Sequence, residues 1–273
     1  MQHFIKQSKQ KRKKIGFVPT MGYLHEGHAS LLRQCKKEND ISVLSIFVNP
    51  KQFAVNEDFE KYPRDQKKDE LLAKKEKVDI IFHPSVKEIY PDGYLTSVAV
   101  ERLGNYLCGK SRPGHFKGVA TVVAKFLNIV LPDVLYLGQK DAQQALIIQR
   151  MIEDLNFPVK VKVLSTVREM DGLAMSSRNN YLTPQERKEA PILFQTLNSA
   201  KEKILAGEAD IHSIIEMMRS TISKNTTGRI DYIECVNART LEPINVLGGE
   251  VLIAVAVWFG QARLIDNLMV RIY

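Results

Sequence analysis

The chain has 273 residues, of which 44% are hydrophobic and 26% charged, a composition typical of a globular protein with one large core or two ordinary ones. The longest apolar run, Val251–Phe259, is too short to span a membrane as a helix, and the N-terminal residues lack the apolar core of a signal peptide. The net charge of +8 would help to attract an anionic substrate such as a nucleotide. We therefore expect a cytoplasmic protein.

The first two-thirds of the sequence alternate strand and helix patterns. In chain order these are a strand at Ile15–Pro19, a helix at Gly27–Glu38, a strand at Ile41–Val48, an exposed helix at Pro63–Lys77, a strand at Val78–Phe82, a helix at Phe116–Val130, a strand at Asp133–Leu137, a helix at Asp141–Leu155 and a strand at Val159–Leu164. This alternation predicts an α/β fold, a Rossmann-like parallel sheet flanked by helices, with ligands at the carboxyl ends of the strands.

The pattern changes near Val167, where we place a boundary between a domain of residues 1–166 and a domain of residues 167–273. Thr183-Pro-Gln-Glu186 has the residues of a capping box and predicts a helix running to about Ala206. Asp210 can cap a second helix through Ser223. Three strands follow, at Ile230–Val236, Glu250–Trp258 and Arg263–Arg271, and predict a smaller C-terminal α+β domain with an antiparallel sheet.

Two features of composition have simple interpretations. The cysteines Cys35, Cys108 and Cys235 are odd in number and widely spaced, which favours reduced thiols over disulfides or a metal site. The basic run Lys9–Lys14 is open to interpretation as a nucleic-acid patch, but no aromatic residues interleave with it. A solvated basic segment before the first strand is the preferred interpretation.

His25 and His28 follow the first strand, where the first helix begins, with Gly22 and Gly27 beside them. Free amides at a helix N-terminus bind phosphate oxygens, and two imidazoles there can donate hydrogen bonds to a phosphoryl group. A zinc site is a weaker alternative, because zinc metalloproteases space their helical histidines four apart with a Glu directly after the first.

The stretch Pro19-Thr-Met-Gly-Tyr-Leu-His-Glu-Gly-His28 is similar to the signature of the nucleotidylyltransferase superfamily, and in this longer form it resembles the pantothenate synthetase family. Further segments downstream match the same family. They are Ser45–Phe53 with Tyr62-Pro-Arg64, Arg112–Thr121, Gly138–Gln144 and Val167–Asn179. The resemblance covers roughly residues 15–270.

The resemblance implies an ATP site and assigns catalytic roles to His28, His25 and Lys140. The residues that it places against ATP are Met21, Gly22, Tyr23, Leu24, His25, Glu26, Gly27, His28, Gly138, Gln139, Lys140, Asp141, Val167, Met175, Ser176, Ser177 and Arg178. Lys140 opposes the dipole of the helix that follows, so a bound anion would explain its position, although a solvated lysine is the usual outcome. Arg178 suits phosphate through its planar fork, and its loop is implied to close over the triphosphate from the second domain.

Gln52 and Gln144 are the residues that the resemblance implies for pantoate, with Gln52 also near the β-alanine site. A neutral amide can donate to and accept from the hydroxyl and carboxylate groups of pantoate. Considered alone, Asn49 and Gln52 fit a capping residue and a surface residue of a turn.

The implied activity is the joining of pantoate to β-alanine with ATP and Mg²⁺, through a pantoyl adenylate, as in coenzyme A biosynthesis. The resemblance also implies a homodimer, and we expect neither nucleic acid nor a membrane among its partners. It suggests Asp69 as a magnesium contact, but a solvated helix carboxylate is the preferred interpretation, so the metal ligands are left unassigned. An adenylyltransferase that releases a dinucleotide and a basic RNA-binding module are the alternatives. Met170 and Ala262 depart from the family pattern and put only local packing in question.

Overall fold

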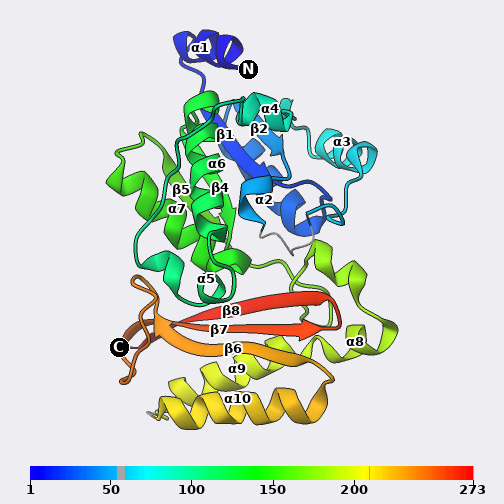
Figure 1. Ribbon diagram of the computed structural model, residues 1–273, viewed down its shortest axis with the longest axis vertical. Coiled ribbons are helices and arrows are strands. Elements are labelled where there is room, and N and C mark those ends of the chain that lie inside the picture. Colours follow the sequence, from blue (N-terminus) through cyan, green and yellow to red (C-terminus); the bar gives the residue numbers. More distant parts are fainter. Residues whose placement is uncertain (54–58, 209, 273) are drawn as a thin grey trace. The chain divides into compact units, whose positions relative to one another are not determined.

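The computed structural model describes residues 1–53, 59–208 and 210–272, which form two compact units (Figure 1). The first unit contains Met1–Gly104, Arg112–Gln139 and Gln144–Ser165. The second contains Asn105–Ser111, Lys140–Gln143 and the C-terminal stretch from Thr166. The predicted domain boundary near Val167 stays a prediction. Two short segments before it, Asn105–Ser111 and Lys140–Gln143, belong to the second unit. No helix within the described ranges has the length and apolar character needed to cross a membrane.

The first unit is built on a parallel sheet, as predicted from the alternation of strands and helices. Its strands lie in the order β3-β2-β1-β4-β5. Their bounds are β1 Ile15–Thr20, β2 Ile41–Ile46, β3 Ile80–Phe82, β4 Val134–Gly138 and β5 Lys160–Leu164. The order reverses between β1 and β4, which pair directly at Gly16–Val134 and Phe17–Leu135. Ligands of such sheets bind outside the carboxyl ends of the strands at this switch point.

Helices cover both faces of this sheet. Alternate strand residues point to opposite faces, so Phe17, Val43 and Leu135 pack with one group of helices, and Val18 and Leu44 with another. The first group comprises α1, α6 and α7, and the second comprises α2 and α3. The helices of this part of the chain are α1 Gln2–Gln10, α2 Glu26–Glu38, α3 Gln66–Lys75, α4 Val86–Ile89, α6 His115–Val130 and α7 Ala142–Asp154.

Helix α1 lies before β1, where no helix was predicted, whereas residues 10–14 of the basic run Lys9–Lys14 are exposed, as expected for a solvated segment. Its Ile5 is completely buried in the core that contains α6, and Lys9 forms an ion pair with Asp133 at 2.7 Å. A single apolar anchor among polar residues gives too little periodicity to predict a helix. The packing of Ile5 nevertheless fixes the segment against the first unit.

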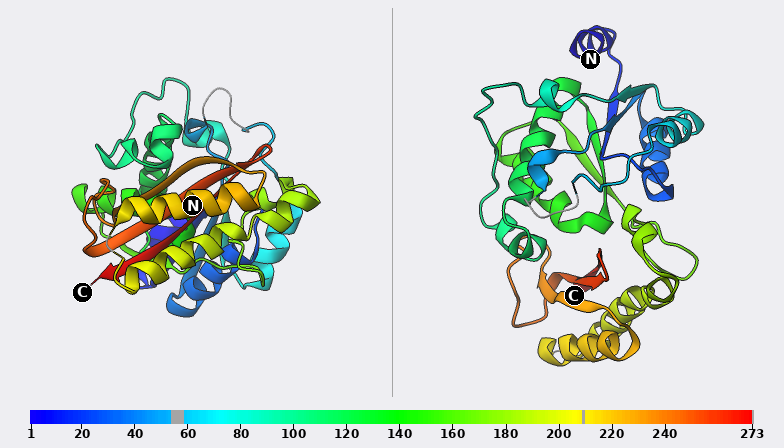
Figure 2. Two further views of the ribbon diagram at one scale, coloured as in Figure 1. Left: turned by 90° about the horizontal axis from the view of Figure 1, so that it is seen from below. Right: turned by 45° about the vertical axis from the view of Figure 1, so that its right-hand side comes forward.

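The second unit contains an antiparallel sheet with strand order β6-β7-β8, which confirms the predicted α+β region. The strands are β6 Arg229–Asn237, β7 Gly249–Phe259 and β8 Ala262–Ile272. Figure 2 shows α9 (Ile192–Leu205) and α10 (Ile211–Asn225) side by side along these strands, and Asp210 caps α10 as predicted. Short helices complete the elements, namely α5 Cys108–Ser111, α8 Pro184–Glu189, η1 Pro50–Gln52, η2 Leu103–Asn105, η3 Gln139–Asp141 and η4 Ser177–Tyr181.

The single helix predicted from Thr183 to Ala206 is wrong, because the structure has two helices there. The capping box at Thr183 is present, but α8 ends at Glu189 and α9 begins at Ile192. Pro191 lies between them; it has no N–H to donate, and its ring conflicts with the carbonyl of Arg187 in a continuous helix. The proline therefore separates the two helices.

Candidate active site

The loop between β1 and α2 carries both histidines, and its conformation requires a glycine. Gly22 has a φ of +83° and Tyr23 a φ of 52°, so two successive residues occupy the left-handed region. A Cβ atom on Gly22 would lie 2.8 Å from Oδ2 of Asp69 and 3.0 Å from a side-chain carbon of Ile46. Any other residue at position 22 would strain the backbone and collide with Asp69.

His25 and His28 form a reciprocal cap at the start of α2. His25 Nδ1 accepts a hydrogen bond from the Gly27 N–H at 3.1 Å, and His28 Nδ1 accepts one from the His25 N–H at 3.2 Å. The two ring centroids are 4.1 Å apart. Because an amide N–H can only donate, a neutral imidazole bonded in this way carries its proton on Nε2. Each ring therefore has an Nε2–H group suited to donating to a phosphate oxygen.

Several backbone amides of this loop are hydrogen-bonded within the protein, which differs from the expectation of free amides. The N–H groups of Tyr23 and Leu24 donate to the two carboxylate oxygens of Asp69, at 2.9 and 2.6 Å. The His28 N–H donates to the His25 carbonyl at 2.9 Å. In this conformation the N–H groups of Tyr23, Leu24 and His28 are satisfied by protein acceptors and are not free to bind a phosphate.

Asp69 lies on α3 and is only 1% exposed, so its interpretation as a solvated carboxylate is wrong. Burial raises the pKa of the Asp69 carboxyl, and the N–H groups of Leu24 and Tyr23 act in the opposite direction. Its two partners are 45 and 46 residues away in sequence, so no local pattern distinguished Asp69 from the other charged residues of α3. The carboxylate anchors the histidine loop from a different helix.

Gln52 lies at the end of η1, where a buried asparagine orients its side chain. Asn49 is 1% exposed; its Nδ2 donates to the Gln52 Oε1 at 3.3 Å and to the Gly118 carbonyl at 3.0 Å. Its Oδ1 accepts from the Tyr90 hydroxyl at 2.8 Å. Gln52 Nε2 lies 2.8 Å from Sδ of Met21, so a residue predicted for pantoate meets one predicted for ATP. A surface position for Gln52 is excluded, because its side chain is buried.

The close approach of η1 to α6 explains why Gly118 occupies that helix. A Cβ atom on Gly118 would lie 2.1 Å from the Lys51 carbonyl oxygen and 2.7 Å from the Gln52 nitrogen. Asn49 bonds to the Gly118 carbonyl at this same point. A larger residue at position 118 would therefore displace the turn that holds Gln52.

Arg112 and His115 also lie beside Gln52, although no role was predicted for either side chain from the sequence. His115 Nδ1 donates to the Gln52 carbonyl at 2.7 Å, since a carbonyl oxygen can only accept. Arg112 Nη1 lies 3.2 Å from His115 Nε2. The available signal was the motif Arg112-Pro-Gly-His-Phe116, which matched the family without a function attached to these side chains.

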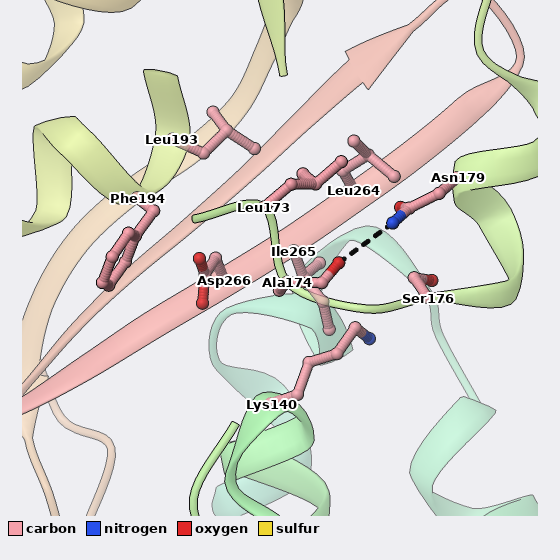
Figure 3. Close-up of a pocket in the computed structure, with 10 residues that line it drawn as sticks. All are labelled: Lys140, Leu173, Ala174, Ser176, Asn179, Leu193, Phe194, Leu264, Ile265 and Asp266. Carbon is pink, nitrogen blue, oxygen red and sulfur yellow. Dashed lines mark hydrogen bonds between the residues drawn. The ribbon is translucent and has the colours of Figure 1, made fainter. Parts of the chain in front are cut away.

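The second unit brings Lys140 and Ser176 to one pocket, as Figure 3 shows. The Lys140 side chain extends toward the side of the pocket where Ser176 lies, and its Nζ is 3.6 Å from Oδ1 of Asp141. Ser176 caps η4 by accepting from the Arg178 N–H at 3.2 Å. The pocket is lined by Lys140, Leu173, Ala174, Ser176, Asn179, Leu193, Phe194, Leu264, Ile265 and Asp266. A cation and a hydroxyl predicted for ATP phosphates therefore share one site in this unit.

A short hairpin connects Val167 to Met175, two further residues predicted for ATP. The Met175 N–H donates to the Val167 carbonyl at 3.0 Å, and Gly172, with a φ of +93°, closes the turn. Met170 is fully exposed at the tip, so its departure from the family pattern disturbs no packing. Ala262, the other departure, is the first residue of β8, pairs with Phe259 of β7 and is completely buried.

The remaining predicted site residues are distributed over the same elements. Glu26 and Gly27 lie in the first turn of α2, Gly138 ends β4, Gln139 and Asp141 lie in η3, Gln144 lies in α7, and Ser177 and Arg178 open η4. The side chain of Ser177 is buried. Within residues 1–53, 59–208 and 210–272, no group of three or more His, Cys, Asp or Glu side chains is arranged to hold a metal ion.

Comparison with known proteins decides the family. The model of the family described as pantoate-beta-alanine ligase matches residues 1–269. The chain belongs to this family. A pantothenate synthetase of Caldicellulosiruptor saccharolyticus is 54% identical over 272 residues, with 100% of this chain and 97% of the relative covered. The pantothenate synthetase of Thermotoga neapolitana is also 54% identical, with 98% and 95% covered.

Solved structures of pantoate-beta-alanine ligases share the fold. The crystal structure of pantothenate synthetase from Thermus thermophilus has a TM-score of 0.91 and 43% identity, with 97% of this chain and 96% of that chain covered. The Francisella tularensis pantoate-beta-alanine ligase, complexed with beta-gamma ATP and beta-alanine, has a TM-score of 0.81 and 38% identity, with 98% and 94% covered. The family predicted from the motifs is confirmed, and with it the ligase class and the fold.

Proposed function

We propose that this ligase joins (R)-pantoate to β-alanine in an ATP-dependent condensation that gives pantothenate, AMP and pyrophosphate. The observation that carries the proposal is the match of one ligase family model to residues 1–269. The contact between Gln52 and Met21 supports it, because it joins a residue expected to hold pantoate to the loop expected to hold ATP. Neither alternative, a dinucleotide-forming adenylyltransferase or an RNA-binding module, would explain a pantoate-beta-alanine ligase match over residues 1–269.

In the first step, a carboxylate oxygen of pantoate attacks the α-phosphorus of ATP, and the bond to the β-phosphate oxygen breaks. Pyrophosphate leaves, and the acyl group remains bonded to AMP. Phosphoryl transfer of this kind requires mainly positioning and charge stabilisation from the protein. His25 and His28 donate from Nε2 to the α-phosphate oxygens as negative charge shifts there, while Lys140, Ser176, Ser177 and Arg178 hold the other phosphates.

In the second step, the β-alanine amine attacks the acyl carbon and AMP leaves. The nitrogen loses one proton as the amide forms, and His28 is the group assigned to proton transfer. Adenylation makes this attack feasible because AMP is a far better leaving group than an oxide ion. Gln52 and Gln144 hold the pantoyl part during both steps, and the Arg112–His115 pair beside Gln52 suits the carboxylate of an incoming amino acid.

Magnesium is proposed only as the ion that accompanies ATP. Mg²⁺ in nucleotide sites is held largely by phosphates and water, with one or two carboxylates. Asp69 does not fit as such a ligand here, because its side chain is buried and each carboxylate oxygen accepts a loop N–H.

An AMP-release assay tests the proposed reaction. AMP should be released over many turnovers only when pantoate, β-alanine and ATP are all present. Omission of either organic substrate should stop this release. Labelled pyrophosphate should exchange into ATP with pantoate alone, since the acyl adenylate forms before the amine is needed. AMP release without pantoate, or a dinucleotide product, would favour the adenylyltransferase instead.

A homodimer and a cytoplasmic location are proposed on the resemblance to the family alone. Light scattering should give a mass about twice the 31.0 kDa of one chain. A mass of one chain at micromolar concentration would contradict the dimer.

A further inference from the structure

Strand β8 contains two adjacent buried polar residues that the proposed reaction does not use. Asp266 is 4% exposed and Asn267 is 5% exposed, in a strand whose other buried residues are apolar or small. Consecutive strand residues point to opposite faces of the sheet, so the two side chains extend in different directions. Each one reaches a segment that carries predicted phosphate ligands.

Asn267 holds the turn that carries Lys140. Its Nδ2 donates to the Lys140 carbonyl at 2.9 Å, across 127 residues of sequence. Its own N–H donates to Oδ1 of Asp266 at 2.8 Å, which connects the two residues of the pair. Loss of this donor would leave the partly buried Lys140 carbonyl without this partner, so the bond favours one backbone conformation at Lys140. The direction of the lysine side chain depends on that backbone.

Asp266 holds the hairpin that leads to Ser176. Its carboxylate accepts two hydrogen bonds from Arg168, at 2.6 and 3.0 Å. Arg168 also donates to the Gly172 carbonyl at 3.1 Å, and its guanidinium lies 3.7 Å from the ring centroid of Phe194. Figure 3 shows Asp266 and Phe194 in the same pocket as Lys140 and Ser176. A bidentate charged pair in a buried position fixes both distance and orientation.

We propose that Asn267 is a positioning residue for Lys140, and that with Asp266 it holds the lysine and the Ser176 loop at the separation that binds ATP phosphates. The inference rests on the proposed function, because it assigns Lys140 to those phosphates. Asn267 itself touches no substrate in this account. It acts by fixing the backbone from which the ammonium group extends.

A double-mutant cycle tests whether Asn267 acts through Lys140. Asn267→Ala should weaken the affinity for ATP with Mg²⁺, measured by calorimetry, about 10- to 100-fold, since small misplacements of a positioned group have effects of this size. In a Lys140→Ala background the same change should have less than about a twofold effect, because the group it positions is gone. Asn267→Asp keeps the size of the side chain but removes its N–H donor, so its ATP affinity should match that of Asn267→Ala. This variant replaces Asn267→Ala in the test if the alanine variant does not fold.

Met269→Ala is the matched control, because residue 269 lies on the same face of β8 two positions along and is exposed. It should leave ATP affinity unchanged. An equal loss from Asn267→Ala in both backgrounds would overturn the proposal, since a general structural role acts without Lys140. Normal ATP affinity in Asn267→Ala, or in Lys140→Ala, would also overturn it. The ATP affinities do not require turnover, so they test the role of Asn267 alone. Failure of the proposed ligase reaction would be detected separately, as absence of AMP release by the wild type.

Discussion

The histidine loop of the first unit and the Lys140 pocket of the second unit are held in different ways. In the histidine loop, the two rings cap each other's backbone within three residues, and Asp69 adds a distant anchor. In the Lys140 pocket, the holding bonds come from β8 across 98 and 127 residues of sequence. A site that caps itself is visible in a short motif, whereas a site held from a distant strand is visible only in the folded chain.

Breaking the Arg168–Asp266 pair should have the largest effect of these changes and should damage the Lys140 pocket alone. We expect Asp266→Asn to lower the free energy of unfolding by about 3–5 kcal/mol, because the largely buried Arg168 would be left without a counter-charge. Glu250→Gln, which removes ion pairs with the exposed Arg239 and Arg271, should cost only about 0–1 kcal/mol. Urea denaturation measures both. Equal costs for the two variants would show that β8 does not hold the pocket.

His25→Asn should separate catalysis from capping in the histidine loop. The asparagine Oδ1 can replace Nδ1 as acceptor of the Gly27 N–H, and asparagine is a favourable N-cap, so the melting temperature should stay near that of the wild type. The Nε2–H donor is lost, and kcat should fall about 100- to 1000-fold. His212→Asn, at an exposed position on α10, is the control. A folded His25→Asn variant with normal turnover would remove His25 from the mechanism.

Asp69→Asn should weaken the distant anchor of the histidine loop that Asp69 provides. An amide has a single acceptor oxygen, so either Tyr23 or Leu24 would lose its partner, at a cost of about 1–3 kcal/mol of stability. Glu70→Gln changes the charge of the exposed neighbour on α3 and should have little effect. Thermal unfolding together with kcat would show whether the loop depends on Asp69. Stability and turnover equal to those of Glu70→Gln would mean that the loop holds itself.

The smallest expected effect is a pH dependence that belongs to Asp69. Its pKa is raised in the folded protein, so the folded chain retains this proton to higher pH than the unfolded chain does. The corresponding contribution to stability is therefore present below the unfolded pKa and is lost as the pH rises through the folded value. The free energy of unfolding of the wild type minus that of Asp69→Asn should decline as the pH rises above about 4. Denaturation at a series of pH values measures this difference. A difference that rises instead would contradict the burial of this carboxyl.

The parts of the fold that sequence predicted are those with strong local periodicity. The strands of both sheets and the helices α2 and α6 were predicted from their apolar residues, and the family was predicted from the motifs. Helix α1 was missed because Ile5 is its only strong apolar anchor, and the helix after Thr183 was extended because Pro191 was not weighed as a break.

The site was predicted unevenly for a related reason. His25, His28, Lys140 and Ser176 lie in recognisable segments, and the structure places each pair together in its own unit. Their supports were not predicted, because Asp69 and Asn267 act on residues that are far away in sequence. The partner of a side chain so far away in sequence depends on the completed fold and cannot be predicted from composition or spacing.

The path of the chain between the two units limits how segments can be exchanged between related proteins. The chain changes unit after residues 104, 111, 139, 143 and 165, so the second unit is assembled from three separate stretches. Gln143 bonds to the backbone of Cys108 and Tyr106, and Arg263 bonds to both Cys108 and Asp231. A gene fragment that begins at residue 166 would omit Cys108 and Gln143 from this network. The C-terminal region is therefore a poor cassette for domain shuffling, and chimaeras between relatives should be joined in ways that keep all three stretches from one parent.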